Sequence, residues 1–188
     1  SEIEKAMIDK LSEQEGVSAV NCVDFDRKEL VKIGEDWYSA DLKAHSIGAP
    51  LPLEIDTREF AFTDNTIENA KLRVVFGADG EITSLFDKIA GKELVKEYFN
   101  KLVVYSDPFK YYNAWDIDIN YLNMDRWELK LTSSNTYIDG AHLIRENSYK
   151  YGKSSLVQKI SLAVGGDTVR FDTAVDWNEK LKMLRADF

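Results

Sequence analysis

Residues 142–177 read HLIRENSYKYGKSSLVQKISLAVGGDTVRFDTAVDW, and this stretch decides the fold. Three segments of it are rich in Val, Ile, Thr and aromatic residues, a composition typical of β-strands: 142–152, 154–164 and 168–177. Gly152 and the Gly165-Gly166-Asp167 turn separate these segments, and such turns join neighbouring antiparallel strands. The stretch therefore predicts consecutive strands of one antiparallel sheet.

The same pattern continues upstream. Further strands are expected over six segments: 58–64, 70–77, 81–87, 100–107, 115–122 and 127–133. A preference for helix is seen only in the segment 91–99, GKELVKEYF. Short strands at regular spacing predict an all-β sandwich or barrel, which we assign to residues 54–188.

The N-terminal part differs. Residues 1–14 predict a short helix with an apolar stripe of Ile3, Met7 and Leu11, and Gly16 ends it. Segments 17–25 and 28–34 then predict two strands joined by a polar turn. Pro50 and Pro52 make 46–53 a connector. The expected organisation is a helix at 1–16, a small β segment with its connector at 17–53, and the β domain at 54–188.

The composition of the chain argues against several classes of partner and location. The chain has 188 residues, a formal charge of −9 and no long basic run, which argues against a nucleic-acid partner. Its single cysteine, Cys22, cannot form an internal disulfide, and no apolar run approaches the ~20 residues of a membrane span. We therefore expect a cytoplasmic protein with no membrane and no nucleic-acid partner.

Few residues offer metal or nucleophile chemistry. Cys22, His45 and His142 are far apart in the sequence, whereas zinc ligands come in close pairs, so we expect no metal site in this chain. Cys22 lies in an apolar run and is expected to be a buried small hydrophobe. Neither a nucleophile elbow nor a phosphate loop is present.

The richest candidate is YYNAWDIDINYLNMDRW, at 111–127. On a strand, Asp116 and Asp118 would share a face with Cβ atoms about 6–7 Å apart, near the ~5–5.5 Å carboxyl separation of retaining glycosidases. A half-exposed strand has the same pattern without catalysis. The aromatic residues of the stretch could stack on sugar rings or pack against neighbouring strands: Tyr111, Tyr112, Trp115, Tyr121 and Trp127.

Several motifs, in order, resemble one family. They are SLFDK at 84–88, GKEL at 91–94, AWDID at 114–118, GKSSLVQKISL at 152–162 and VDWNEKLKMLRADF at 175–188. Together they resemble the β-rich region of glycoside hydrolase family 38, the α-mannosidases, and most closely the cytosolic and bacterial branch. The resemblance implies a large two-sheet antiparallel β-sandwich of the galactose-mutarotase-like supersandwich type. It also implies that the sandwich is incomplete here and that residues 1–16 end a helical bundle.

The resemblance further implies a division of labour. In the family a separate α/β domain carries zinc and a nucleophilic aspartate for retaining hydrolysis of α-mannosides. This chain should then hold no catalytic residue, and its partners should be the catalytic and helical-bundle domains of the same enzyme, with homo-oligomer contacts also expected. Trp115, Asp116 and Asp118 are the predicted substrate-proximal or interdomain residues. Tyr112-Asn113 replace the Trp-Asp that the family is expected to show before this motif, which argues against direct sugar contact by those two.

Three alternatives stay open at this stage. A free-standing carbohydrate-binding β module would use an aromatic platform around Trp115 and Trp127. A self-sufficient glycosidase or sugar epimerase would use Asp116 and Asp118. A plain interaction domain would present an exposed apolar patch.

Overall fold

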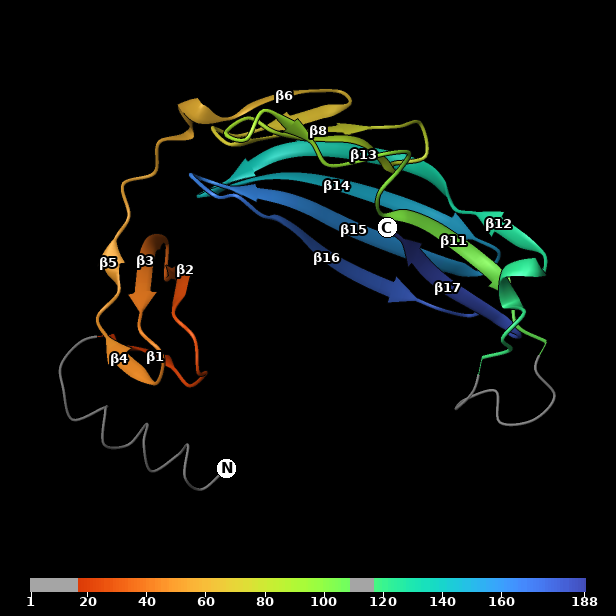
Figure 1. Ribbon diagram of the computed structural model, residues 1–188, viewed down its shortest axis with the longest axis horizontal. Coiled ribbons are helices and arrows are strands. Elements are labelled where there is room, and N and C mark those ends of the chain that lie inside the picture. The colour runs from red at the N-terminus through yellow and green to blue at the C-terminus, as the bar shows by residue number, and fades with distance from the viewer. Residues whose placement is uncertain (1–16, 109–116) are drawn as a thin grey trace. The chain divides into compact units, whose positions relative to one another are not determined.

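The computed structural model describes residues 17–108 and 117–188, and Figure 1 shows their strands. The chain divides into two compact units, residues 1–55 and 56–188. The expected helix over 1–14 lies outside the described residues. None of the helices in the described ranges has the length and apolar character that crossing a membrane requires.

The described part of the smaller unit, residues 17–55, holds five short strands in two sheets. Its strands are β1 (Ala19–Asn21), β2 (Arg27–Ile33), β3 (Asp36–Leu42), β4 (Ser46–Gly48) and β5 (Leu51–Pro52). β1 pairs with β4, and the other sheet has the order β2-β3-β5. Two expectations need correction: β1 does not pair with the strand that follows it, and the expected connector 46–53 contains β4 and β5. The buried amide of Asn21 explains the first, since it donates to the carbonyl oxygens of Phe25 and Lys43 at 2.8 and 2.9 Å and so draws the segment before β4 toward β1.

The larger unit holds three antiparallel sheets (Figure 1). The first, ordered β10-β9-β8-β7-β6, consists of β6 (Ala61–Thr63), β7 (Thr66–Glu68), β8 (Leu72–Phe76), β9 (Ile82–Asp87) and β10 (Lys92–Glu93). The second, ordered β12-β11-β17, consists of β11 (Lys101–Ser106), β12 (Arg126–Glu128) and β17 (Lys182–Asp187). The third, ordered β13-β14-β15-β16, consists of β13 (Lys130–Asp139), β14 (His142–Tyr151), β15 (Ser154–Ala163) and β16 (Val169–Asp176). Two single-turn 3-10 helices, η1 (Thr57–Glu59) and η2 (Tyr121–Asn123), complete the described elements.

The four-stranded sheet packs one face against both other sheets, which confirms the predicted all-β sandwich. Its Leu143, Ile160 and Leu162 pack on the β6–β10 sheet, in a cluster that also contains Ile67, Leu72, Val74, Phe76, Ile82 and Leu85. Farther along the same strands, Tyr149 and Leu156 pack on Leu102 and Val104 of β11. Each such side chain contributes about 1.5–3 kcal/mol of hydrophobic stabilisation when fully buried.

A polar band separates the two apolar clusters. Between Leu143 and Tyr149 of β14 stand the buried Arg145 and Asn147, and Gln158 lies opposite Asn147 on β15. The Gln158 amide exchanges hydrogen bonds with the buried Asn100 at 2.7 and 3.2 Å and donates to the Thr173 hydroxyl at 3.1 Å. Because each buried amide has partners, these amides are buried without a large desolvation cost.

One local expectation is wrong. The segment 91–99 contains no helix: Lys92–Glu93 form β10, which pairs with Phe86 and Asp87. A carboxylate oxygen of Glu93 accepts the backbone N–H groups of Leu85, Leu94 and Val95 at 2.8–3.0 Å. This side chain therefore takes the backbone donors that a helix would need.

Candidate functional site

The candidate site residues fall partly outside the described chain. Trp115 and Asp116 lie in the range 109–116, which the structure does not describe. Asp118 is described and half-buried. Its carboxylate accepts the backbone N–H of Asn120 at 2.8 Å, and its carbonyl oxygen accepts that of Tyr121 at 2.9 Å. These bonds make a turn that leads into η2, so the strand predicted over 115–122 is absent from residues 117–122, and a shared strand face for the two aspartates has no support.

Tyr121 attaches this turn to the β12-β11-β17 sheet. Its ring packs edge-on against Tyr105 of β11, with centroids 5.4 Å apart and planes at 79°. Its hydroxyl accepts a short hydrogen bond from the guanidinium of Arg185 on β17. That guanidinium also lies 5.8 and 5.6 Å from the ring centroids of Tyr105 and Tyr121. The turn is thus held by an aromatic contact and a charge-assisted hydrogen bond.

Asp187 completes this group. It is only 7% exposed. One carboxylate oxygen accepts the Tyr105 hydroxyl at 3.3 Å, and the other forms an ion pair with Nε of Arg185. The ion pair lacks hydrogen-bond geometry, so the attraction is between charges. Since β17 alternates its faces, Arg185 and Asp187 lie on the side opposite Leu184 and Ala186, which pack in the core.

The connection between β11 and β12 is fixed at both ends. The backbone N–H of Ser106 donates to the carbonyl oxygen of Asp125 at 2.8 Å, and that of Asp107 donates to Leu181 at 2.9 Å. Lys101 and Glu128 form an ion pair of 2.7 Å between the two strands, and its hydrogen bond raises the pKa of Lys101 and lowers that of Glu128. The sheet therefore presents residues 117–123 on a stable support.

The chemistry that this surface offers is limited. Within residues 17–108 and 117–188, no three His, Cys, Asp or Glu side chains gather closely enough to hold a metal ion. Asp118 is engaged with local backbone, and Cys22 is exposed rather than buried as predicted. His45 lies in an exposed turn with φ 50°, and His142 is half-buried at the start of β14.

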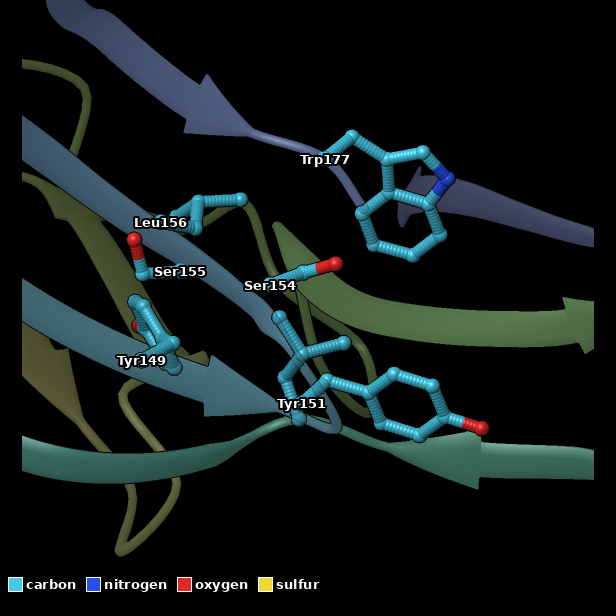
Figure 2. Close-up of a pocket in the computed structure, with 7 residues that line it drawn as sticks. Tyr149, Tyr151, Ser154, Ser155, Leu156 and Trp177 are labelled. Carbon is cyan, nitrogen blue, oxygen red and sulfur yellow. The ribbon is translucent and has the colours of Figure 1, made fainter. Parts of the chain in front are cut away.

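Aromatic residues gather at the far end of the four-stranded sheet. Figure 2 shows Tyr151 at the end of β14 and Trp177 just after β16, beside a shallow depression that Ser154 and Leu156 also line. The rings of Tyr151 and Trp177 are nearly parallel, at 7°, with centroids 6.3 Å apart. Trp127 lies 6.3 Å from Tyr151, and the Lys182 ammonium stands 3.4 Å above the Trp127 ring. We call Trp127, Tyr151 and Trp177 the aromatic trio.

The sequence pointed to only part of this arrangement. The expected platform of Trp127 with Trp115 stays a prediction, because Trp115 lies outside the described residues. Among the described residues, Trp127 lies beside Tyr151. Trp177 is half-buried at the margin of the core. Arg185 and Asp187 were missed because 182–187 was not predicted as a strand. Their separation by one residue, with Leu184 and Ala186 on either side of Arg185, is the signal that would have placed them on one strand face.

Comparison with curated proteins finds α-mannosidases. The chain is 29% identical over 139 residues to "Alpha-mannosidase G" of Dictyostelium discoideum. It is 30% identical over 130 residues to "Alpha-mannosidase 2C1" of Homo sapiens, and equally so to that of Mus musculus. Each match covers 65% of this chain and 12% of the relative, so the chain matches only a small part of each relative's length.

The family comparison agrees with these relatives. Residues 67–188 match the model described as "Glycosyl hydrolases family 38 C-terminal domain". This range begins in β7 and includes the four-stranded sheet, the β12-β11-β17 sheet and the Tyr121–Arg185–Asp187 group. Of the β6–β10 sheet it includes all but β6 and the first residue of β7. Since the match spans more than half of the chain, the chain belongs to glycosyl hydrolase family 38, within its C-terminal domain.

Proposed function

We propose that this chain is the non-catalytic β-sandwich portion of an α-mannosidase. The observation that carries the proposal is the family match over residues 67–188, together with relatives that are themselves named α-mannosidases. The parent enzyme would hydrolyse α-mannosides with retention, using zinc and a nucleophilic aspartate of a separate catalytic domain. This chain would serve mannose metabolism by supporting that domain, and its resemblance to the cytosolic branch makes the cytoplasm the proposed compartment.

The surface around η2 is the proposed contact with the sugar site or the catalytic domain. Trp115, Asp116 and Asp118 belong to the segment that Tyr121 and Arg185 hold on the sheet at its described end. In this role Asp118 shapes the turn through the backbone of Asn120, while the neighbouring residues meet the partner domain or the α-mannoside. Partners are therefore other domains of the same enzyme, and homo-oligomer contacts remain part of the proposal.

The test is hydrolysis of a chromogenic α-mannoside by this chain at high protein concentration, with and without added zinc. We expect no turnover in either condition, because the proposal places the zinc and the nucleophilic aspartate in a separate catalytic domain. Co-expression with the catalytic and helical-bundle domains of a family member should then restore turnover. Activity of the chain alone that survives purification and disappears in Asp116→Asn would overturn the proposal and favour a self-sufficient glycosidase.

The aromatic trio favours a second candidate, a free-standing carbohydrate-binding β module. Nearly parallel Tyr151 and Trp177, with the 36% exposed Trp127 beside them, could stack on sugar rings. Calorimetric titration with mannose oligosaccharides distinguishes the candidates. Saturable binding that is lost in Trp127→Ala would favour the module, whereas no binding by the isolated chain favours the supporting role. Trp37→Ala in the smaller unit is the control, because this half-buried Trp lies outside the trio.

A further inference from the structure

A polar hollow is lined by residues of the β6–β7 turn and its flank, of β13 and of β14. Its volume is about 520 Å³. Its lining includes the hydroxyl residues Thr63, Ser134 and Thr136, the carboxylate residue Asp64 and the guanidinium of Arg145. All of these belong to the larger unit and to elements other than the η2 turn, so the site is independent of the proposed function.

Arg145 is held rigidly in the wall of this hollow. The residue is 4% exposed. Its guanidinium lies 4.5 Å from the ring centroid of Phe76, Nε donates to Oδ1 of Asn147 at 3.1 Å, and one Nη1 hydrogen binds the carbonyl oxygen of Asp64. One face of the Arg145 guanidinium and two of its N–H donors are thus occupied. These contacts preorganise the guanidinium, which lowers the entropy cost of binding a ligand.

Arg145 lines the hollow, and part of its guanidinium has no partner in the described chain. Nη2 has no hydrogen-bond partner in the described chain, yet it is not an unpaired atom enclosed from solvent, so solvent reaches it. Buried charges in proteins are normally paired. No carboxylate of the described residues lies within the 4.0 Å of an ion pair with Arg145. Burial lowers the pKa of Arg145, as expected for a charge without such a partner.

Two nearby carboxylates do not fill this role. Glu146 points to the opposite face of β14, where it pairs with Lys159 at 3.5 Å. Asp64 binds Arg145 through its backbone carbonyl, while its exposed carboxylate borders the hollow. This carboxylate attracts Arg145 only from beyond ion-pair distance, and it would repel an anionic ligand.

We propose that the hollow binds a small oxyanion, a phosphate, sulfate or carboxylate group, either free or carried by a sugar-sized metabolite. The open edge of the Arg145 guanidinium is the anchor, since its fork of donors matches such groups. The hydroxyls of Ser134 and Thr136 supply further donors. The hollow is larger than an inorganic anion requires, which leaves room for the rest of a metabolite.

The test titrates the 188-residue chain with inorganic phosphate, sulfate and glucose 6-phosphate against sodium chloride at matched ionic strength. The readout is the amide NMR shift of Ser134 and Thr136. We expect saturable shifts with phosphate or sulfate and none with chloride. Tighter binding of glucose 6-phosphate than of phosphate would identify a metabolite-borne group, and equal binding would identify a free anion.

Three variants distinguish binding of an anion in the hollow from nonspecific binding elsewhere on the protein. Arg145→Gln should weaken binding at least about tenfold, because it removes the anchor charge. Thr136→Val leaves Arg145 in place and should weaken binding several-fold even if Arg145→Gln fails to fold. Arg170→Gln is the matched control, because this exposed arginine of β16 pairs with Asp172 at 2.9 Å and lies outside the hollow, and its binding should equal that of wild type.

The direction in which Asp64→Asn changes the binding affinity distinguishes an oxyanion from a neutral ligand. The substitution keeps the backbone carbonyl that binds Arg145 and removes the repelling carboxylate, so an oxyanion should bind several-fold more tightly. A neutral polyhydroxyl ligand would use Asp64 as an acceptor and would bind more weakly. Linear, unsaturable shifts in wild type, or shifts that Arg170→Gln reduces as much as Thr136→Val does, would overturn the proposal.

Discussion

Asn69 shows how a single residue joins distant parts of this sandwich. The residue is fully buried. Its amide nitrogen donates to the carbonyl oxygens of Ala163 and Gly166 at 2.8 and 2.9 Å, and its amide oxygen accepts the backbone N–H groups of Lys71 and Leu72 at 2.9 and 2.8 Å. One side chain therefore satisfies backbone groups of two turns that are far apart in the sequence. Such a residue specifies which turn meets which.

Gly80 makes a comparable contact through the absence of a side chain. Its φ is +81°, and an added Cβ would lie 2.2 Å from the Tyr149 hydroxyl oxygen and 2.9 Å from Nδ2 of Asn147. Gly80→Ala should therefore lower the free energy of unfolding by about 2–4 kcal/mol, through backbone strain and a clash in the polar band. Urea unfolding measures the change.

The matched control is Gly91→Ala. Gly91 also has positive φ, at +63°, but an added Cβ would meet nothing within 4 Å. Only the conformational strain should remain, about 1 kcal/mol. Equal destabilisation by the two variants would show that the contact of Gly80 with Tyr149 does not matter.

The phenol of Tyr149 makes the stability depend on pH. Burial raises the pKa of Tyr149 from its ordinary value of 10.0 to about 12. The folded state thus favours the neutral phenol, so this stabilisation is complete below pH 10 and is lost as pH rises through 12. Wild type should lose roughly 2–3 kcal/mol more unfolding free energy over this range than Tyr149→Phe.

Comparing the two proteins by urea unfolding at pH 9, 10, 11 and 12 removes the contribution of other titrating lysines and tyrosines. At pH 9 the substituted protein should be the less stable of the two, because Asn147 loses its partner, the Tyr149 hydroxyl at 3.2 Å. The difference between the curves is therefore the measurement. Parallel curves would contradict a buried, pKa-raised phenol.

At the scale of elements, short segments are held by strands that lie far away in the sequence. η2 has no side-chain cap, yet its Tyr121 lies against Tyr105 and Arg185. The 3-10 geometry of a single turn is weak alone, so tertiary contacts supply most of its stability. For η2 these tertiary contacts are the edge-on ring contact with Tyr105 and the charge-assisted hydrogen bond from Arg185.

Tyr121→Ala should loosen this turn locally. It removes the ring contact and the hydroxyl, at a cost of about 1–2 kcal/mol for a half-buried side chain. Hydrogen exchange of the Tyr121, Asn123 and Met124 amides, which donate to Asp118, Asn120 and Tyr121, should accelerate about 5- to 30-fold. Leu122→Ala is the control, since Leu122 is 58% exposed, and its exchange should match wild type. Unchanged protection in Tyr121→Ala would show that other contacts hold the turn.

At the scale of the whole molecule, the two units have separate interiors. Every buried residue of the two main apolar clusters belongs to residues 56–188. Within residues 17–55 the buried apolar residues are Ala40 and Leu42, so the hydrophobic stabilisation of this described part is small. Stability of the sandwich should therefore not depend on the smaller unit.

Removal of residues 1–55 should leave a protein that unfolds cooperatively. We expect the fragment 56–188 to keep the near-ultraviolet circular dichroism of its buried Tyr105 and Tyr149 and a urea midpoint equal to that of the sandwich in the full chain. A fragment that lacks this signal, or that unfolds without a cooperative transition, would show that the smaller unit is needed for folding.

The sequence by itself determined the fold class and the family. Stretches rich in Val, Ile, Thr and aromatics with Gly turns sufficed for β14, β15 and β16, because strand preference and tight turns are local properties. The ordered motifs sufficed for family 38, which the match over residues 67–188 confirms. The sequence predicted that Asp118 is a candidate site residue, but it did not predict that its carboxylate accepts a backbone N–H in a turn.

Only the tertiary structure decided which residues meet. The strand predicted over 115–122 failed at 117–122 because Asp118 and Tyr121 find partners in the local backbone and in β17, and such contacts override strand preference. β1 pairs with β4 rather than with the next strand, and Arg145 becomes an open cation only where β13 and the β6–β7 turn meet. These pairings join residues far apart in the chain, and their energies depend on burial and distance in space, which local sequence patterns do not contain.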